Sequence, residues 1–175
     1  MAKAPGSQSQ NCSNLTSLSM GFNNITSLRH LIIMYSPNLV TLLQGLQNLS
    51  SLQSLTNLGC CWEFKSLPDE LQNLMRLQSL EIRSCPGLEA LPEWIKMLVS
   101  LRSSAISDCQ NITCLPESLK HLIGLQHLSI QDCPKLLKRC RQQSGEDWPK
   151  IAHVPFKHLG SSELRHQSET SISSN

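Results

Sequence analysis

The 175-residue chain has few aromatic residues, because phenylalanine, tryptophan and tyrosine together make up only 4% of it. Aliphatic side chains must therefore fill any hydrophobic core. No run of about 18 apolar residues occurs, so the sequence offers no candidate for a membrane-spanning helix. The glycine-rich pattern G-x-x-x-x-G-K-[ST], which cradles nucleotide phosphates, is also missing. These absences argue against a membrane protein and against a P-loop nucleotide hydrolase.

The amino terminus has one early lysine and no apolar segment of the kind that signal peptides contain. We therefore expect a cytoplasmic chain whose eight cysteines stay reduced. The formal net charge is only +2, and a local excess of basic residues lies at 135–150. That segment carries no nucleic-acid-binding motif, so we interpret it as a solvated end of the fold and expect no nucleic-acid partner.

Leucine recurs through the chain with a fixed period. One clear copy, from Leu74 to Leu98, reads Leu-x-x-Leu-x-x-Leu-x-Ile-x-x-Cys-x-x-Leu-x-x-Leu-Pro-x-x-Ile-x-x-Leu. Positions equivalent to Cys85 fall at 12, 36, 60, 85, 109 and 133, so successive steps are 24, 24, 25, 24 and 24 residues. This spacing is the signature of leucine-rich repeats. It predicts about five stacked repeats over residues 11–137, and such stacks bind partners more often than they catalyse reactions.

Each repeat predicts a short strand and a return limb. Leu80 and Ile82 alternate with Glu81, so we expect the two apolar side chains to face inward. A cysteine or serine then turns the chain, and its side chain can satisfy a backbone group there. A Leu-Pro step follows, and proline suits the first position of a short helix. The predicted fold class is an α/β solenoid: a short curved stack with a parallel sheet on the concave face and irregular or short helical convex limbs.

Two strand positions are polar where the repeat expects an inward apolar side chain. They are Asn57 and Ser104. Either the strand register shifts locally at such a position, or the core is relaxed there. We expect the shift at Asn57, because that copy of the repeat is one residue longer than its neighbours.

The outward strand positions form a candidate interaction face. Solenoids present such a surface to extended protein partners. Many of these side chains are small, so the sequence leaves open whether the face binds anything in isolation. The residues of this face, here called the concave residues, are His30, Ile32, Met34, Ser54, Thr56, Ser79, Glu81, Arg83, Ser103, Ala105, Ser107, His127, Ser129 and Gln131.

The two ends of the chain differ from the repeats in composition. Residues 1–10 and 156–175 are rich in serine and glutamine and lack periodic apolar residues, so we expect both to be disordered. Residues 138–155 interrupt the repeat and follow its last leucines. Terminal repeats need a cap over their open core. We predict a C-terminal cap in this segment, with three apolar residues to cover the core: Trp148, Ile151 and Val154.

The first clear strand, expected at 31–33, has only a blurred repeat before it. An uncovered edge strand can pair with another chain. We therefore expect the isolated chain to self-associate through an open N-terminal end, or to unfold first from that side.

The cysteines do not show the spacing of a metal site or of a disulfide framework. Cys60-Cys61 and Cys109-x4-Cys114 lack the C-x-x-C pattern, and one cysteine per repeat is explained by the turn. We predict no metal and no cofactor, and we expect the chain not to be an enzyme.

One catalytic alternative uses Cys140 as a nucleophile with His153. Basic residues stand on both sides of the cysteine, and they would lower its pKa and favour the thiolate. The sequence indicates no third group that would orient the histidine, so this thiol-enzyme hypothesis is the weakest of those considered.

A second alternative is a secreted leucine-rich-repeat inhibitor or receptor ectodomain. It is favoured by N-x-[ST] sequons, which accept glycans in secreted proteins. The absent signal peptide argues against it, as does the lack of the Gly-x-Ile-Pro phrase typical of extracellular plant repeats. The sequons begin at Asn11, Asn14, Asn24, Asn48 and Asn111.

Three segments resemble the C-terminal leucine-rich-repeat region of plant coiled-coil/nucleotide-binding/leucine-rich-repeat disease-resistance proteins. They are Leu-Pro-Glu-Trp-Ile at 91–95, Leu-Ser-Ile-Gln-Asp-Cys-Pro-Lys-Leu at 128–136, and Gly-Glu-Asp-Trp-Pro-Lys-Ile-Ala-His-Val-Pro at 145–155. The resemblance implies a role in pathogen recognition and defence. It also implies a protein partner: a pathogen effector, a host guardee, or the receptor's own domains that are missing here. The nucleotide-binding domain of that family has no counterpart in this sequence.

Overall fold

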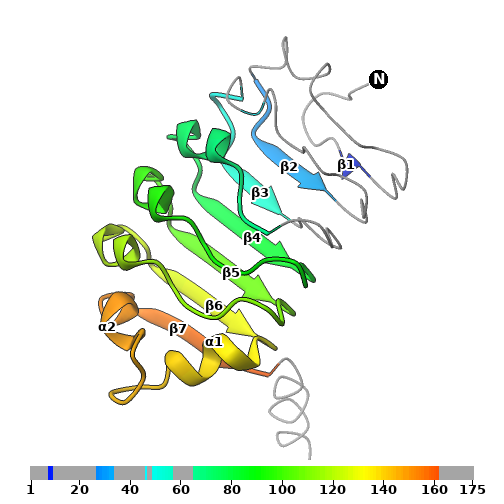
Figure 1. Ribbon diagram of the computed structural model, residues 1–175. Coiled ribbons are helices and arrows are strands. Elements are labelled where there is room, and N and C mark those ends of the chain that lie inside the picture. The colour runs from blue at the N-terminus through cyan, green and yellow to red at the C-terminus, as the bar shows by residue number, and fades with distance from the viewer. Residues whose placement is uncertain (1–7, 10–26, 34–45, 47–48, 57–64, 162–175) are drawn as a thin grey trace, which may run out of the picture.

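A computed structural model describes residues 8–9, 27–33, 46, 49–56 and 65–161, and the structural statements below concern those residues. Its strands form one parallel sheet in which spatial order follows chain order. Figure 1 shows a curved stack with the strands along one side and short helices along the other. This is the predicted α/β solenoid. The strands are β1 (Gln8–Ser9), β2 (His30–Ile33), β3 (Ser54–Thr56), β4 (Ser79–Arg83), β5 (Ser103–Ser107), β6 (His127–Gln131) and β7 (Phe156–Gly160).

Burial alternates along each strand as the repeat predicts. In β4 the side chains of Leu80 and Ile82 are 1% exposed, whereas Glu81 between them is half-buried. Ser104 keeps the inward position of β5, beside Leu80 of β4, and is only 4% exposed. The register therefore does not shift at this polar residue, because complete strands on both sides fix it. The expected shift at residue 57 lies outside the described residues.

The return limbs contain short 3-10 helices: η2 (Asp69–Asn73), η3 (Glu93–Met97) and η4 (Glu117–His121). The proline of the Leu-Pro step stands just before each helix, so the prediction that it takes the first helical position is wrong. Pro68 is extended, with φ −68° and ψ 145°, and its carbonyl accepts the first hydrogen bond from Leu71 N at 3.1 Å. Proline suits this place because its fixed φ matches an extended entry to the helix.

The cysteine of each complete repeat ends its strand in the same way. The Cys85 thiol donates a hydrogen bond to the Arg83 carbonyl at 3.4 Å, and Cys109 and Cys133 make the equivalent contact. The preceding residue, Ser84 in this repeat, has a φ of 49°. Aspartate takes that left-handed position in the next two repeats, which suits a short side chain that can bond locally. The predicted role of the turn side chain is confirmed in these three repeats.

The structure extends the sheet at both ends, where disorder was predicted. Strand β1 pairs with β2, and β7 pairs with β6 along its whole length. The prediction of disorder is therefore wrong for 8–9 and 156–160, and the expectation of an uncovered strand at 31–33 is wrong as well. The edge of a parallel sheet offers unpaired backbone groups, and these can order a segment whose composition alone predicts no structure. The other residues of 1–10 and 162–175 lie outside the described residues.

The C-terminal segment packs against the last repeat through α1 (Pro134–Arg139) and α2 (Trp148–Ile151). Ile151 is fully buried and Val154 is 1% exposed, so both belong to the hydrophobic core. Trp148 is only partly buried against that core, and the Lys157 ammonium lies 5.2 Å from its ring centroid. The two aliphatic residues, more than the tryptophan, complete the core here. None of the described helices is long and apolar enough to cross a membrane.

Candidate protein-interaction surface

Strand register arranges the concave residues in three parallel rows. All that fall within the described residues are half-buried or exposed, as outward positions should be, and Met34 lies outside the described residues. Strand β7 adds Phe156 and His158, two residues that were not predicted because their segment was expected to be disordered. The rows are His30, Ser54, Ser79, Ser103, His127 and Phe156; Ile32, Thr56, Glu81, Ala105, Ser129 and His158; and Arg83, Ser107, Gln131 and Gly160.

Several polar side chains of this face bond to one another within a strand. Glu81 and Arg83 form an ion pair in β4. Gln131 Nε2 donates to Ser129 Oγ at 3.0 Å in β6. The charges of β4 therefore compensate each other, and the face offers hydrogen-bonding groups and shape without a strong net charge.

A hollow of about 500 Å³ lies at the C-terminal part of the face, over β5, β6 and β7. Its lining includes three small outward residues: Ser103, Ala105 and Ser129. On its rim the rings of His127 and Phe156 stack, with centroids 4.9 Å apart and an interplanar angle of 12°. Phe156 remains 64% exposed, so an aromatic surface stands beside a shallow depression.

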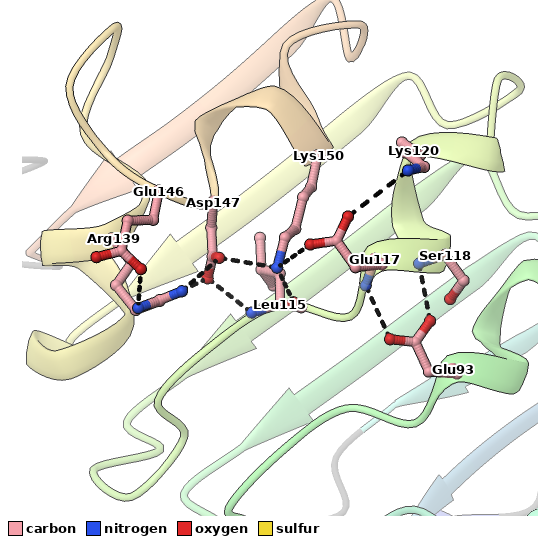
Figure 2. Close-up of polar contacts among 9 residues, drawn as sticks. All are labelled: Glu93, Leu115, Glu117, Ser118, Lys120, Arg139, Glu146, Asp147 and Lys150. Carbon is pink, nitrogen blue, oxygen red and sulfur yellow. Dashed lines mark hydrogen bonds and ion pairs between the residues drawn. The ribbon is translucent and has the colours of Figure 1, made fainter.

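Figure 2 shows a second feature, a polar network at the C-terminal end. The Asp147 carboxylate is fully buried and accepts a hydrogen bond from Leu115 N at 2.8 Å. Arg139 donates to the two carboxylate oxygens from Nε at 3.2 Å and from Nη2 at 3.1 Å. Lys150 Nζ lies 2.9 Å from Oδ1. Burial alone would raise the pKa of Asp147, but these bonds to the charged form outweigh it and hold the pKa below its ordinary value.

Lys150 also binds the Leu-Pro step of the last repeat. Its ammonium donates to the Leu115 carbonyl at 2.7 Å and lies 3.0 Å from Glu117 Oε1. Both backbone groups of Leu115 are thus held by side chains from the segment 145–155. Asp147 and Lys150 belong to the Gly-Glu-Asp-Trp-Pro-Lys phrase at the start of this segment, so that phrase has a structural role in this chain.

Glu93 links the last two return limbs in a similar way. Its carboxylate accepts hydrogen bonds from the backbone N–H groups of Glu117, at 2.9 Å, and Ser118, at 2.8 Å. N–H groups at the start of a helix such as η4 have no acceptor within that helix, and a negative side chain is favourable there. Partial burial would raise the pKa of Glu93, but the bonds from Ser118 and Glu117 lower it overall.

The geometry contradicts the thiol-enzyme hypothesis. Cys140 is fully buried, and burial, together with the Asp147 charge, raises the pKa of its thiol to about 12 despite the nearby Arg139. The expected lowering by basic neighbours is therefore wrong. His153 is exposed, and its Nε2 lies 3.1 Å from the Leu122 carbonyl. A buried neutral thiol cannot act as the proposed nucleophile.

The same burial predicts how the thiols react. Of the five cysteines in the described residues, Cys114 is half-buried and the other four are buried. Among these five, we expect iodoacetamide to label Cys114 first and the four buried thiols only at the rate of unfolding, as followed by peptide mass spectrometry. Without reductant, all eight cysteines should react in denaturant, because we predict no disulfides. Labelling of Cys140 as fast as Cys114 would contradict the structure.

Comparison with known proteins supports the repeat assignment. Residues 63–133 match the family model for R13L1/DRL21 leucine-rich repeats. No curated protein matches the chain. A solved leucine-rich-repeat protein of Leptospira interrogans is 27% identical, with a TM-score of 0.60, over 69% of this chain and 30% of that one. The solved leucine-rich-repeat domain of the type III effector XopL is 23% identical, with a TM-score of 0.50, over 74% of this chain and 52% of its own.

This chain therefore spans about a third to a half of the length of those solved chains. The family match covers the repeats that contain β4 and β5 and ends just after β6. It does not extend to the phrase at 145–155 or to any nucleotide-binding domain. The chain thus contains a leucine-rich-repeat region, similar to the R13L1/DRL21 repeats, in a fold that serves protein binding.

Proposed function

We propose that the chain is a non-enzymatic recognition module of a plant immune receptor, acting in the cytoplasm through its concave face. The match to R13L1/DRL21 repeats supports the link to disease resistance. The open sheet of outward side chains supports binding to an extended protein surface. The partner is a pathogen effector, a host guardee or another domain of the same receptor.

The observation that carries this proposal is the hollow over β5, β6 and β7. Protein interfaces gain most of their binding energy from a few aromatic or arginine side chains that fill pockets. Here small outward side chains line the hollow beside the stacked His127 and Phe156 rings. A partner side chain that enters the hollow would also bury Phe156, which is 64% exposed in the free chain.

The contacts of Asn111 favour the cytoplasmic role over a secreted one. Its Nδ2 donates to the Pro86 carbonyl at 2.8 Å, and its Oδ1 accepts from Lys135 Nζ at 3.0 Å. A glycan on Nδ2 would compete with the contact that ties this turn to the preceding repeat. The other four sequons lie outside the described residues.

The test fills the hollow with Ser103→Arg and Ser129→Arg. Both residues are half-buried and face outward, so the fold should persist. Binding is measured by co-immunoprecipitation from leaf tissue, against pathogen effectors and nucleotide-binding domains of resistance proteins. We expect the parent to bind at least one of them and the double variant to bind it about tenfold more weakly or less.

Asn73→Arg is the matched control, because it adds an arginine to an exposed position of η2 on the convex side. It should bind like the parent. Equal binding by the double variant would show that the concave hollow is not the site. A parent chain that binds no member of the panel would count against the immune-receptor function itself.

A further inference from the structure

Large exposed hydrophobic side chains are few in the described residues, and most of them gather in one place. Met75 is 50% exposed, Val99 66% and Ile123 88%. Their positions are 24 residues apart, so they are equivalent residues of three successive repeats. Met97, 40% exposed, lies two residues before Val99. The remaining exposed large hydrophobic in the described part, Phe156, belongs to the concave face.

Met75, Val99 and Ile123 lie in the turns that lead from each 3-10 helix into the next strand, and Met97 is the last residue of η3. These turns run along the edge where helices and strand beginnings meet (Figure 1). Backbone hydrogen bonds tie the ends of these turns together. Arg102 N donates to the Gln78 carbonyl at 2.8 Å, and Gln126 N donates to the Arg102 carbonyl at 2.8 Å. The three turns therefore lie side by side. We call Met75, Met97, Val99 and Ile123 the edge stripe.

The stripe is not the scatter of apolar residues that any surface carries. Single exposed hydrophobic residues are common and need no explanation, whereas contiguous ones mark interaction sites. Neither folding nor core packing requires an apolar residue at these positions, because the equivalent position one repeat earlier is the exposed Ser50. The stripe thus begins at Met75 and extends over three repeats.

The segments that contain the stripe carry charges of one sign. Segments 72–78, 96–102 and 120–126, each the end of a 3-10 helix with the turn after it, contain no aspartate or glutamate. They carry four full cations, and a histidine at 121. In the described part of the chain, no ion pair involves Arg76 or Lys96. Lys120 Nζ lies 3.6 Å from a Glu117 oxygen. The four cations are Arg76, Lys96, Arg102 and Lys120.

Arg102 is held in place beside the stripe. Its Nη1 donates to the Gly124 carbonyl at 3.1 Å, next to Ile123. A Cβ atom at Gly124 would lie 1.9 Å from that nitrogen, so a larger residue there would displace the guanidinium from this position. The Arg102 charge therefore lies directly beside Ile123 at this point of the edge.

We propose that the edge stripe is a second docking surface, separate from the concave face, that binds an acidic amphipathic helix of another protein. Adjacent parallel strands lie about 4.8 Å apart, and an α-helix advances about 5.4 Å per turn. A helix laid along the stack therefore places one residue of each turn opposite one repeat. The apolar residues of such a helix at i, i+4 and i+7 would contact Met75, Val99 and Ile123 in turn. Its acidic residues on the flank face the cations.

The same chemistry fits an anionic lipid surface less well. Membrane-bound surfaces insert a broad apolar face flanked by basic residues, whereas this stripe is about one side chain wide over two of its three repeats. The stripe residues also follow the repeat spacing, which is close to the rise per turn of a helix. A fluid bilayer has no regular spacing that they could match. Lipid binding is accordingly an outcome of the test.

The test variant is Met75→Ser/Val99→Ser/Ile123→Ser in the full chain, with Phe156→Ser as the matched control from the concave face. All four side chains are exposed, so circular dichroism melting curves should stay close to that of the parent. A random peptide library is selected on the parent after depletion on the triple variant. Fluorescence anisotropy then gives the dissociation constants of the recovered peptides.

We expect recovered peptides to be acidic, with apolar residues at i, i+4 and i+7, and to become helical when bound. The triple variant should bind them about tenfold more weakly or less, and Phe156→Ser should bind like the parent. Arg76→Glu/Lys96→Glu should weaken binding, and so should added salt.

Each of four results would overturn the proposal. They are failure to recover any peptide, recovery of peptides without this pattern, and equal binding by the triple variant and the parent. The fourth is assignment of the stripe to another occupant. Binding of the parent, but not the triple variant, to vesicles of phosphatidylcholine and phosphatidylserine would assign it to membranes. Self-association of the parent that the triple variant abolishes, by sedimentation velocity, would assign it to a second copy.

Discussion

Replacing Asp147 with alanine should lower the free energy of unfolding by about 3–5 kcal/mol, the loss typical when one member of a buried ion pair is removed. The fully buried carboxylate binds Arg139, Lys150 and the Leu115 N–H. Its loss leaves a buried N–H and a nearly buried ammonium with fewer partners. Since small domains are stable by only about 5–15 kcal/mol, the variant should unfold at much lower urea concentration.

Glu146→Ala is the matched control from the neighbouring position. Glu146 also pairs with Arg139, but its side chain is 74% exposed. Exposed pairs of this kind contribute at most about 1 kcal/mol, so this variant should unfold close to the parent. Similar urea midpoints for the two alanine variants would show that the Asp147 network does not stabilise the last repeat.

The pH dependence of Asp147→Ala follows from the direction of the pKa shift. The pKa of Asp147 is lower in the folded chain than its ordinary value of about 4 in an unfolded chain. The carboxylate therefore stabilises the fold above about pH 4, and this contribution disappears as the pH falls through the folded pKa. The difference in stability between parent and variant should accordingly shrink in acid.

Removal of β7 should have an effect of similar size. A chain that ends after Pro155 loses the strand that pairs with β6 and flanks Leu128 and Ile130. Both side chains are at most 3% exposed in the intact chain. Exposing a buried aliphatic side chain costs about 1.5–3 kcal/mol, so we expect a loss of roughly 3–6 kcal/mol when both lose this cover.

The comparison chain ends after Ser161 and keeps β7. The difference between the two truncations isolates the strand from the residues beyond it. Urea unfolding followed by circular dichroism gives both free energies. If the two truncated chains unfold at the same midpoint, β7 does not stabilise the solenoid, as the predicted disorder of residues 156–175 implies.

The repeats were predictable because their signal is local. The leucine spacing and the cysteine at each strand end define strand, turn and limb within 24 residues. Strand β7 was not predictable in this way, because Lys157 occupies the inward position that Leu128 holds in β6. Its ammonium instead donates to the carbonyls of Ala152 and Val154. The alternation of Phe156 and His158 with Lys157 and Leu159 was the available signal, and the serine-rich composition obscured it.

The buried carboxylate was not predictable for a different reason. Asp147 stands among charged residues, a context that normally indicates solvent exposure. Its main-chain partner, Leu115, lies 32 residues earlier, and only the completed stack brings them together. The edge stripe, by contrast, is visible in the sequence as apolar residues at 75, 99 and 123. A pattern built on leucines does not include these positions.

The alternation of burial along the strands has a consequence for how this protein can diverge. In β5, Ser104 and Ile106 are buried, whereas Ser103, Ala105 and Ser107 face outward. Substitutions at outward positions remove no core contacts, and surface changes usually alter stability by about 0.5 kcal/mol or less. Selection for a new partner can therefore act on the outward rows alone. Recognition can change from one lineage to the next while the inherited inward rows keep the scaffold intact.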